Sequence, residues 1–201
     1  MEGPEKSRTV SDVPGRLRLG LYGGSFDPIH HGHLILAREA REQLGLDRVI
    51  FIPAAVSPHK LVQPPAPAEF RLEMVRASID GEPGFEVDDL EIRRPPPSYS
   101  IHTVRQYRET YPEADLFYLI GGDNLTDLES WVSIDELRAL CQFVLLGRGS
   151  SEPVGLPVID RPVDISSTDI RNRVASGRSI RYLLPEPACE VILRQNLYRS
   201  P

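Results

Sequence analysis

Three histidines lie within four residues of one another in this sequence, at His30, His31 and His33. They follow a short apolar run that ends in two glycines, and they precede a segment whose apolar residues recur with helical spacing. A helix that begins here turns its free backbone N–H groups and the positive end of its dipole toward a ligand. Because His30 and His33 are three residues apart, both rings can face one phosphate group. The pattern predicts an anion site, at which Gly23 and Gly24 allow the backbone to approach the ligand closely.

Two other interpretations of these histidines are simpler or different in kind. Glycines can make an ordinary turn, and histidines can occupy an ordinary surface. A His-x-x-His pair can also bind zinc, but the sequence offers no third ligand at a suitable spacing. We therefore expect phosphate binding and no metal held by these side chains.

A second candidate phosphate-binding segment lies at residues 165–171 and reads Ile-Ser-Ser-Thr-Asp-Ile-Arg. Ser166, Ser167 and Thr168 are of the types that cap helix N-termini, and Arg171 lies one turn further on. A plain capped helix with a surface arginine is the alternative interpretation.

Together the two segments resemble the signatures of a known enzyme superfamily. Residues 23–33, which read Gly-Gly-Ser-Phe-Asp-Pro-Ile-His-His-Gly-His, are similar to the loop of nucleotidyltransferases that carry an HxGH motif, and residues 165–171 resemble their ISSTxIR motif. The first loop most resembles that of the bacterial nicotinate-mononucleotide adenylyltransferases, and the similarity covers residues 17–199. It implies transfer of AMP from ATP to nicotinate mononucleotide, which gives nicotinate adenine dinucleotide and pyrophosphate in NAD biosynthesis.

The resemblance also implies a set of site residues. The catalytic residues would be His30, His33, Lys60 and Arg171. The ATP-binding residues would be Gly23, Gly24, Ser25, Phe26, Gly32, His33, Gly121, Asp123, Ser166, Ser167, Thr168 and Arg171. The mononucleotide-binding residues would be Ser25, Tyr99, Ser100 and Trp131.

Several assignments depend on features that distinguish the nicotinate enzymes. Lys60 ends a Ser-Pro-His-Lys segment that resembles one near phosphate in that family, although a solvated loop lysine would look the same. Trp131, the only tryptophan, matches a position where indole packs against the pyridine ring, and a core tryptophan is the alternative. Residues 97–103 resemble the mononucleotide-binding segment. There Ser100 replaces the usual Thr and His102 the usual Asp, so no catalytic role is transferred to His102.

Two residues after later apolar runs are candidates for the adenosine side. Asp123 follows two glycines in a segment that resembles the family's approach to adenosine, where it fits a ribose or a metal-bound water. A helix N-cap is the alternative role. Arg148 is a weaker candidate, since its segment lacks the proline common in the family.

The implied reaction is attack of the mononucleotide 5′-phosphate on the α-phosphorus of ATP. A phosphate oxygen is already anionic, so the step needs no general base, and positioning and charge stabilisation would dominate. His33 would stabilise charge on the α-phosphate, while Lys60 and Arg171 would hold the β- and γ-phosphates. Mg²⁺ would bridge phosphate oxygens mainly through water, which fits the lack of a dense carboxylate cluster.

Two alternatives of different kinds stay open. Pantetheine-phosphate adenylyltransferases share both phosphate motifs, and a nucleotide-binding regulator could keep the fold without catalysis. The Ser-Pro-His-Lys segment and Trp131 argue against the first, and the intact His30, His33, Lys60 and Arg171 argue against the second. The residues do not decide between nicotinate and nicotinamide as the substrate ring.

Composition limits the partners. The 201 residues carry a net charge of −6, and the pI is near 5.4, so the overall basic surface of a nucleic-acid-binding protein is absent. No apolar run approaches the ~18 residues of a membrane span. Cys141 and Cys189 have no metal-binding or redox spacing.

Residues 1–16 are polar and lack the apolar segment of a signal peptide, so we expect a disordered extension and a cytoplasmic protein. Composition leaves homo-oligomer formation open.

Apolar runs alternate with helical patterns from residue 17 onward. We predict strands at residues 17–22, 49–53, 85–92, 115–120, 143–146 and 158–159, and helices at 34–44, 68–79, 101–111, 126–131, 134–141, 167–176 and 187–197. The alternation predicts a single α/β domain over 17–201, Rossmann-like and doubly wound, with a mostly parallel sheet. Ligands of such sheets bind beyond the carboxyl ends of the strands, where the strand order reverses. The first loop must lie there.

Overall fold

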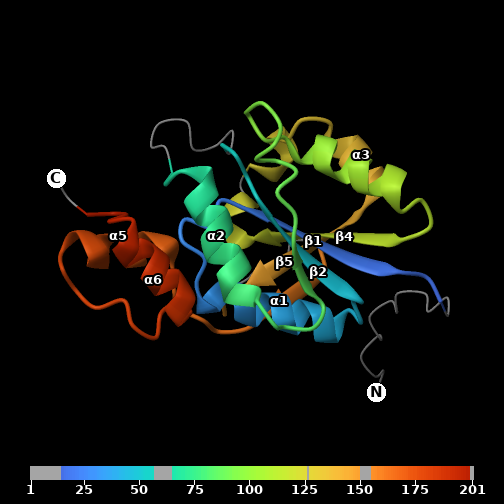
Figure 1. Ribbon diagram of the computed structural model, residues 1–201. Helices are drawn as coiled ribbons and strands as arrows, with labels where there is room; N and C mark the ends of the chain where they lie inside the picture. The colour runs from blue at the N-terminus through green and yellow to red at the C-terminus, as the bar shows by residue number, and fades with distance from the viewer. Residues whose placement is uncertain (1–14, 57–64, 126, 150–154, 200–201) are drawn as a thin grey trace, which may run out of the picture.

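Six parallel strands form one sheet at the centre of the molecule (Figure 1). The computed structural model describes residues 15–56, 65–125, 127–149 and 155–199. The strands are β1 (Arg18–Gly24), β2 (Arg48–Pro53), β3 (Phe85–Val87), β4 (Asp115–Gly121), β5 (Gln142–Gly147) and β6 (Val158–Asp160). Their order is β3-β2-β1-β4-β5-β6, and every neighbouring pair is parallel. This is the doubly wound Rossmann order, so the predicted fold class is confirmed, and the strand order reverses between β1 and β4.

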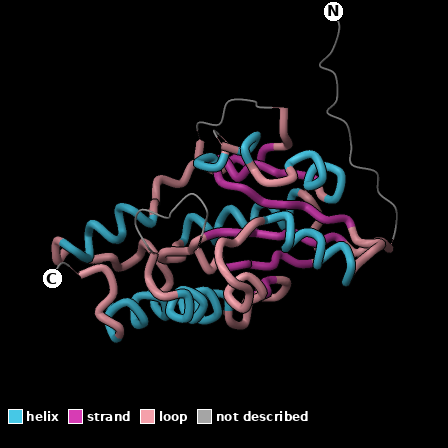
Figure 2. Tube along the Cα trace, turned by 90° about the horizontal axis from the view of Figure 1, so that it is seen from above, coloured by secondary structure: helices cyan, strands magenta, loops and turns pink. Residues whose placement is uncertain are grey.

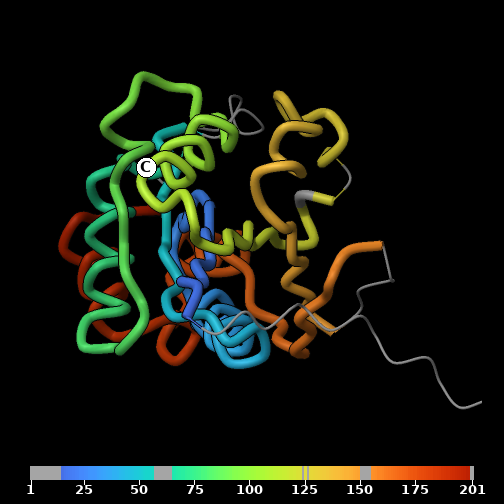
Figure 3. The backbone as a smooth tube through the Cα atoms, turned by 90° about the vertical axis from the view of Figure 1, so that its right-hand side faces the viewer, coloured from blue at the N-terminus to red at the C-terminus, as the bar shows by residue number. Residues whose placement is uncertain are grey.

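Helices cover both faces of the sheet, as seen from above in Figure 2. One face is packed by α1 (His31–Gln43), α2 (Ala68–Ile79), α5 (Ser167–Ala175) and α6 (Glu186–Arg194), and the other by α3 (Ser100–Thr110) and α4 (Ile134–Leu140). Helices α2 and α6 lie side by side (Figure 1 and Figure 3), and Arg194 of α6 pairs with Glu73 of α2. The C-terminal part of the chain is therefore anchored to the same face as the first helix.

The central strands are apolar on both sides because both faces are covered. Leu19 and Leu21 of β1 point into the core under α3 and α4, while Tyr22 belongs to the opposite core. Gly20 has no room for a side chain, since a Cβ atom there would lie 2.7 Å from a methyl group of Leu46. The continuous apolar runs in the sequence thus reflect burial on two faces.

Two predicted elements are shorter in the structure. The strand predicted to reach residue 92 ends at Val87, because the Asp88 carboxylate accepts the backbone N–H of Leu90 at 2.9 Å and turns the chain. The last helix ends at Arg194. Asn196 then adopts a left-handed φ of 51°, a backbone conformation that is incompatible with a continuing α-helix. In place of a helix over 126–131, the described residues form 3₁₀ turns at Gly122–Asn124 and Leu128–Ser130.

Most of the predicted N-terminal extension lies outside the described residues. Arg16, which the sequence places in that extension, forms an ion pair with Asp115 at 3.3 Å. Cys141 and Cys189 are free thiols. Within the described ranges, no helix has the length and apolar character needed to cross a membrane.

Candidate active site

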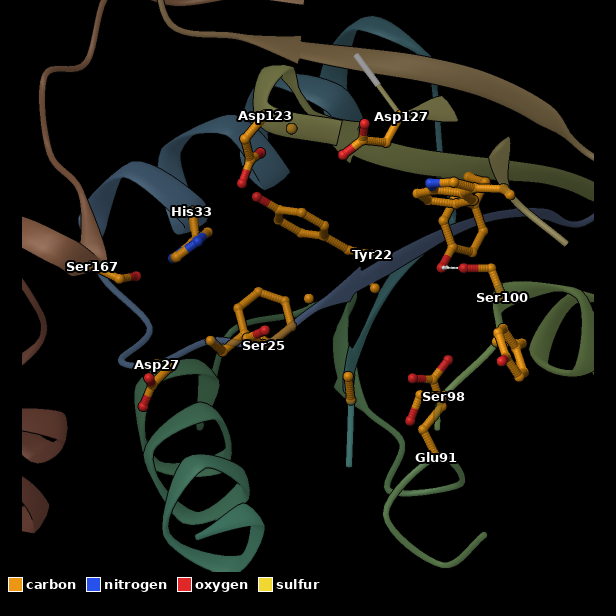
Figure 4. Close-up of a pocket in the computed structure, with 18 of the residues that line it drawn as sticks. Tyr22, Ser25, Asp27, His33, Glu91, Ser98, Ser100, Asp123, Asp127 and Ser167 are labelled. Atoms are coloured by element: carbon orange, nitrogen blue, oxygen red, sulfur yellow. Dashed lines mark hydrogen bonds between the residues drawn. The ribbon is translucent and has the colours of Figure 1, made fainter. Parts of the chain in front are cut away.

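A cavity of about 380 Å³ opens beyond the carboxyl ends of β1 and β4, where the strand order reverses (Figure 4). Most of the predicted site residues line it. They are Gly23, Gly24, Ser25, Phe26, His33, Tyr99, Ser100, Gly121, Asp123, Trp131, Ser166, Ser167, Thr168 and Arg171. Segments that are far apart in the sequence therefore meet at one cavity.

The two glycines at the end of β1 make room for aromatic side chains of the protein itself. A Cβ atom on Gly23 would lie 2.5 Å from the hydroxyl of Tyr118, and one on Gly24 would lie 3.0 Å from the ring of Phe26. Phe26 has a left-handed φ of 45°, a strained backbone conformation for a bulky residue. Its buried ring packs edge-to-face against His33, with 5.2 Å between ring centroids. The glycines thus permit a tightly packed loop as well as close approach of a ligand.

The structure brings only one of the two predicted histidines to the cavity. His33 lines it, whereas His30 is fully buried behind it. The rings stack with centroids 3.7 Å apart, and the backbone N–H of His30 donates to His33 Nδ1 at 3.2 Å. That bond leaves the proton of a neutral His33 ring on Nε2. Burial, with the charge of Arg148 adding to it, lowers the pKa of His30 to about 3, so His30 is neutral at pH 7.

The second phosphate motif docks directly on the first loop. Ser166 caps α5, because its hydroxyl accepts a backbone N–H at 3.1 Å. The hydroxyl of Ser167 donates to the carbonyl of Pro28 at 2.9 Å, and Arg171 Nη1 donates to the carbonyl of Asp27 at 2.7 Å. In Figure 4 the side chains of Ser167 and Asp27 lie at the same end of the cavity as His33. Three groups suited to a triphosphate, namely a histidine, an arginine and a capped helix N-terminus, thus share one end of the cavity.

Aromatic side chains build the opposite end of the cavity. The hydroxyl of Tyr118 donates to Ser100 Oγ at 2.8 Å (Figure 4). Trp131 meets Tyr118 edge-to-face at 5.9 Å and Phe143 at 6.1 Å. Trp131 therefore lines the cavity and also packs on core aromatics, and its stacking on the pyridine ring stays a prediction. An indole fixed from behind can present its face to a planar ring.

Glu91 is a cavity residue that sequence reasoning missed. Its side chain is only 4% exposed and accepts the hydroxyl of Thr103 at 2.6 Å, with Arg94 at 3.9 Å. Burial raises the pKa of this carboxyl, while Thr103 and Arg94 partly oppose the shift. The available signal was an acidic residue between two apolar ones, in a segment interpreted as a strand.

A second missed residue holds the loops beneath the cavity. The Arg71 side chain is 1% exposed, and its three nitrogen atoms donate to the carbonyls of Ser25 at 2.7 Å, Ala55 at 2.9 Å and Ala66 at 2.8 Å. Burial lowers the pKa of this guanidinium, and the nearby Asp27 opposes that shift. The signal lay in the helical spacing, which places this arginine on the apolar face of α2.

Charged residues complete the rim. Arg148 lines the cavity, and its Nη1 donates to the carbonyl of Ile165 at 3.0 Å. Asp123 and Asp127 project from the segment after β4, and the hydroxyl of Tyr22 points toward Asp123 (Figure 4). In the described part of the chain, no group of three or more histidine, cysteine or acidic side chains could hold a metal ion.

Among the described residues that the sequence highlights, Gly32 and His102 also do not line the cavity. Lys60 lies outside the described residues. Gly32 contacts the buried ring of His30, since a Cβ atom there would lie 3.0 Å from it. His102 is exposed and lies outside the cavity lining.

The fold and the site together define a nucleotide-binding protein of the doubly wound α/β class. A model of the cytidylyltransferase-like family matches residues 21–173. The chain belongs to this family, and the membership predicted from the two phosphate motifs is confirmed.

Curated relatives match nearly the whole chain. One, from Exiguobacterium sibiricum and called "Probable nicotinate-nucleotide adenylyltransferase", is 44% identical over 92% of this chain and 100% of its own length. A relative of the same name from Thermus thermophilus is 43% identical over 91% of this chain and 100% of its own length.

Solved structures share the fold. The nicotinic acid mononucleotide adenylyltransferase of Plasmodium falciparum, complexed with NaAD, has a TM-score of 0.75 at 18% identity and covers 91% of this chain and 98% of its own. The same enzyme complexed with APC has a TM-score of 0.74 at 19% identity, with the same coverage. At these identities the likeness supports the fold alone.

Proposed function

We propose that this protein transfers AMP from ATP to nicotinate mononucleotide, giving nicotinate adenine dinucleotide and pyrophosphate. One observation carries the proposal: one end of a single cavity has His33 and Arg171, which are suited to phosphate, and the other end is aromatic, with Trp131. The curated relatives, about as long as this chain and called nicotinate-nucleotide adenylyltransferases, support the choice of substrate.

The reaction forms one phosphorus–oxygen bond and breaks another. An oxygen of the mononucleotide 5′-phosphate attacks the α-phosphorus of ATP, and the bond to the bridging oxygen of the β-phosphate breaks. Pyrophosphate leaves with that electron pair. Because the attacking oxygen is an anion, the protein needs to position two anions and stabilise charge, and no side chain has to remove a proton.

The geometry supports a role for each residue at the phosphate end. His33 presents Nε2–H to the α-phosphate, because its Nδ1 is held by the backbone of His30. His30 acts as a positioning residue, since its stacked and buried ring fixes the plane of His33. Arg171 holds the β- and γ-phosphates, and Arg148, which also lines the cavity, keeps its predicted place on the adenosine side. Lys60 keeps its predicted role at the same phosphates.

The aromatic end would bind the mononucleotide. Trp131 would stack on the pyridine ring, and Tyr99 and Ser100 would contact the nucleotide from the start of α3. Ser100 is held by Tyr118, so the usual threonine hydroxyl has a fixed substitute here.

Mg²⁺ would enter as part of the ATP complex. The two carboxylates at the rim, Asp123 and Asp127, suit contacts through metal-bound water. When bound, the ion neutralises charge on the phosphates.

The free thiols Cys141 and Cys189 suit a reducing compartment, and we place the enzyme in the cytoplasm.

A pyrophosphate-release assay tests the proposal. Purified protein with ATP and Mg²⁺ is offered nicotinate mononucleotide, nicotinamide mononucleotide or phosphopantetheine in separate reactions. We expect the highest kcat/KM with nicotinate mononucleotide. Preference for phosphopantetheine would replace this proposal with the pantetheine-phosphate alternative, and no turnover with any acceptor would favour the non-catalytic regulator.

A further inference from the structure

Asp27 connects the phosphate-binding loop to the C-terminal end of the chain. Its side chain is about one-tenth exposed, and Oδ1 accepts the hydroxyl of Tyr198 at 2.7 Å and the backbone N–H of Ala66 at 3.1 Å. Tyr198 is 171 positions away in sequence. This contact is among the longest in sequence separation within the domain, and it reaches a residue of the cavity lining.

The same aspartate also holds the arginine of the second phosphate motif. Arg171 Nη1 donates to the Asp27 carbonyl at 2.7 Å and lies 3.7 Å from Asp27 Oδ2. Its Nη2 donates to Thr168 Oγ1 at 3.2 Å. These contacts orient the guanidinium, whose side chain is still 30% exposed at the cavity.

The backbone of the C-terminal segment directs the Tyr198 hydroxyl toward Asp27. Both Asn196 and Tyr198 have left-handed φ values, of 51° and 61°, which turn the chain back after α6. Tyr198 packs against the core cluster that also contains Phe26. Burial raises the pKa of its phenol, and the charge of Asp27 adds to the effect, so the hydroxyl keeps its proton and donates.

We propose that Tyr198 and Asp27 are positioning residues for adenylyl transfer: the C-terminal segment fixes the Asp27 carboxylate, and Asp27 in turn aims Arg171 at the triphosphate. The inference rests on the proposed function, in which Arg171 holds the β- and γ-phosphates. Its physical basis is that a cation already oriented by fixed partners needs no reorganisation when charge moves to the departing pyrophosphate.

The first test replaces Tyr198 by Phe, which removes only the hydroxyl. We expect kcat/KM for ATP to fall about five- to tenfold, less than for the loss of a direct hydrogen bond to a charged group, because Tyr198 acts on Arg171 through Asp27. The KM for nicotinate mononucleotide should stay within twofold. The matched control is Tyr182→Phe, since Tyr182 is 77% exposed and does not line the cavity; its kinetics should not change. A Tyr198→Phe enzyme with unaltered kcat/KM for ATP would overturn the inference, even if its melting temperature fell.

The second test uses Asp27→Asn, which keeps an oxygen acceptor for Tyr198 and Ala66 but removes the charge that faces Arg171. We expect a larger loss of kcat/KM for ATP than with Tyr198→Phe. Because both changes act through the same residue, the double variant should lose little more than Asp27→Asn alone. If the fold losses of kcat/KM in the two single variants multiply in the double variant, the proposed chain of contacts is contradicted.

The wild-type reaction separates the two proposals. If the unmodified protein releases no pyrophosphate with any mononucleotide, the proposed function fails. If it is active and Tyr198→Phe behaves like wild type, only the positioning role fails.

Discussion

The two ends of the cavity are built in different ways. At the phosphate end, contiguous motifs supply the groups, and backbone carbonyls hold them in place. Arg171 donates to the carbonyl of Asp27, and the buried Arg71 donates to the carbonyls of Ser25, Ala55 and Ala66. At the aromatic end, single side chains from separate elements meet, as Trp131 and Ser100 do around Tyr118.

This difference suits the two ends of the cavity to different tasks. Hydrogen bonds to fixed carbonyls tolerate little displacement, which suits a reaction that depends on aligned phosphates. Aromatic packing depends on shape and area, which suits recognition of a planar ring. Changes at the phosphate end should therefore affect kcat or the stability of the loops, and changes at the aromatic end should affect KM for the mononucleotide.

The largest effect is expected for His33→Ala. Loss of the Nε2 donor should lower kcat about 10²- to 10³-fold, as for a removed oxyanion donor. The matched control is His31→Ala, because His31 starts the same helix but does not line the cavity. Pyrophosphate release measures both. A near-normal kcat for His33→Ala would show that His33, at the phosphate end, does not take part in the chemical step.

Arg71→Lys should reduce the free energy of unfolding by about 2–3 kcal/mol, because one ammonium cannot replace three directed bonds in a buried site. The control is Arg76→Lys on the same helix, whose side chain is 56% exposed. Urea unfolding compares the two. Equal, small losses in both variants would show that the buried arginine does not hold the loops.

The buried His30 should make stability depend on pH. Its folded-state pKa is about 3, below the ordinary value near 6.5, so between these values the unfolded chain binds more protons. The stabilisation from its neutral burial is complete above pH 6.5 and is lost as pH falls. From pH 7 to pH 5 this amounts to about 2 kcal/mol.

His30→Gln should remove that share of the pH dependence, and His31→Gln should keep it. Urea unfolding at pH 7 and pH 5 gives the difference for each variant. If wild type and His30→Gln lose the same stability over this range, His30 is not held neutral.

Trp131→Ala should raise KM for the mononucleotide about tenfold, and KM for ATP should change much less, because the stacking surface lies at one end only. Trp131→Phe keeps an aromatic face and should retain most of the affinity. Equal rises in both KM values would assign Trp131 to the core alone.

The smallest effect is expected at His102, the third residue of α3. His102→Asp should stabilise the protein by about 0.3–1 kcal/mol, since a negative charge there favours the helix dipole. His102→Asn is the uncharged control. Kinetic constants should not change, and a change in KM for the mononucleotide would bring this position into the site.

Much of the fold could be predicted from the sequence. Both faces of the sheet are covered, so its strands appear in the sequence as continuous apolar runs. The helix α2 begins and ends at the predicted residues, Ala68 and Ile79, and the sixth strand was found at Val158. The end of β3 at Val87 could not be recognised, because the contact between Asp88 and Leu90 is a local turn inside an alternating pattern.

The site was predictable to the extent that it is encoded in contiguous segments. The position of His33 and Arg171 at the cavity can be predicted because each lies in a motif at a helix start. Arg71 and Tyr198 were not predicted, because their importance arises from the carbonyl and carboxylate they meet in space. The spacing of His30 and His33 predicts one shared phosphate for both, because it does not show that the stacked ring of His30 is fully buried.

The most direct test of the account is a crystal structure of the protein with Mg²⁺ and a non-hydrolysable ATP analogue. The account predicts one triphosphate within hydrogen-bond distance of both His33 Nε2 and the Arg171 guanidinium. A triphosphate bound elsewhere, or one that contacts only one of these two side chains, would contradict it.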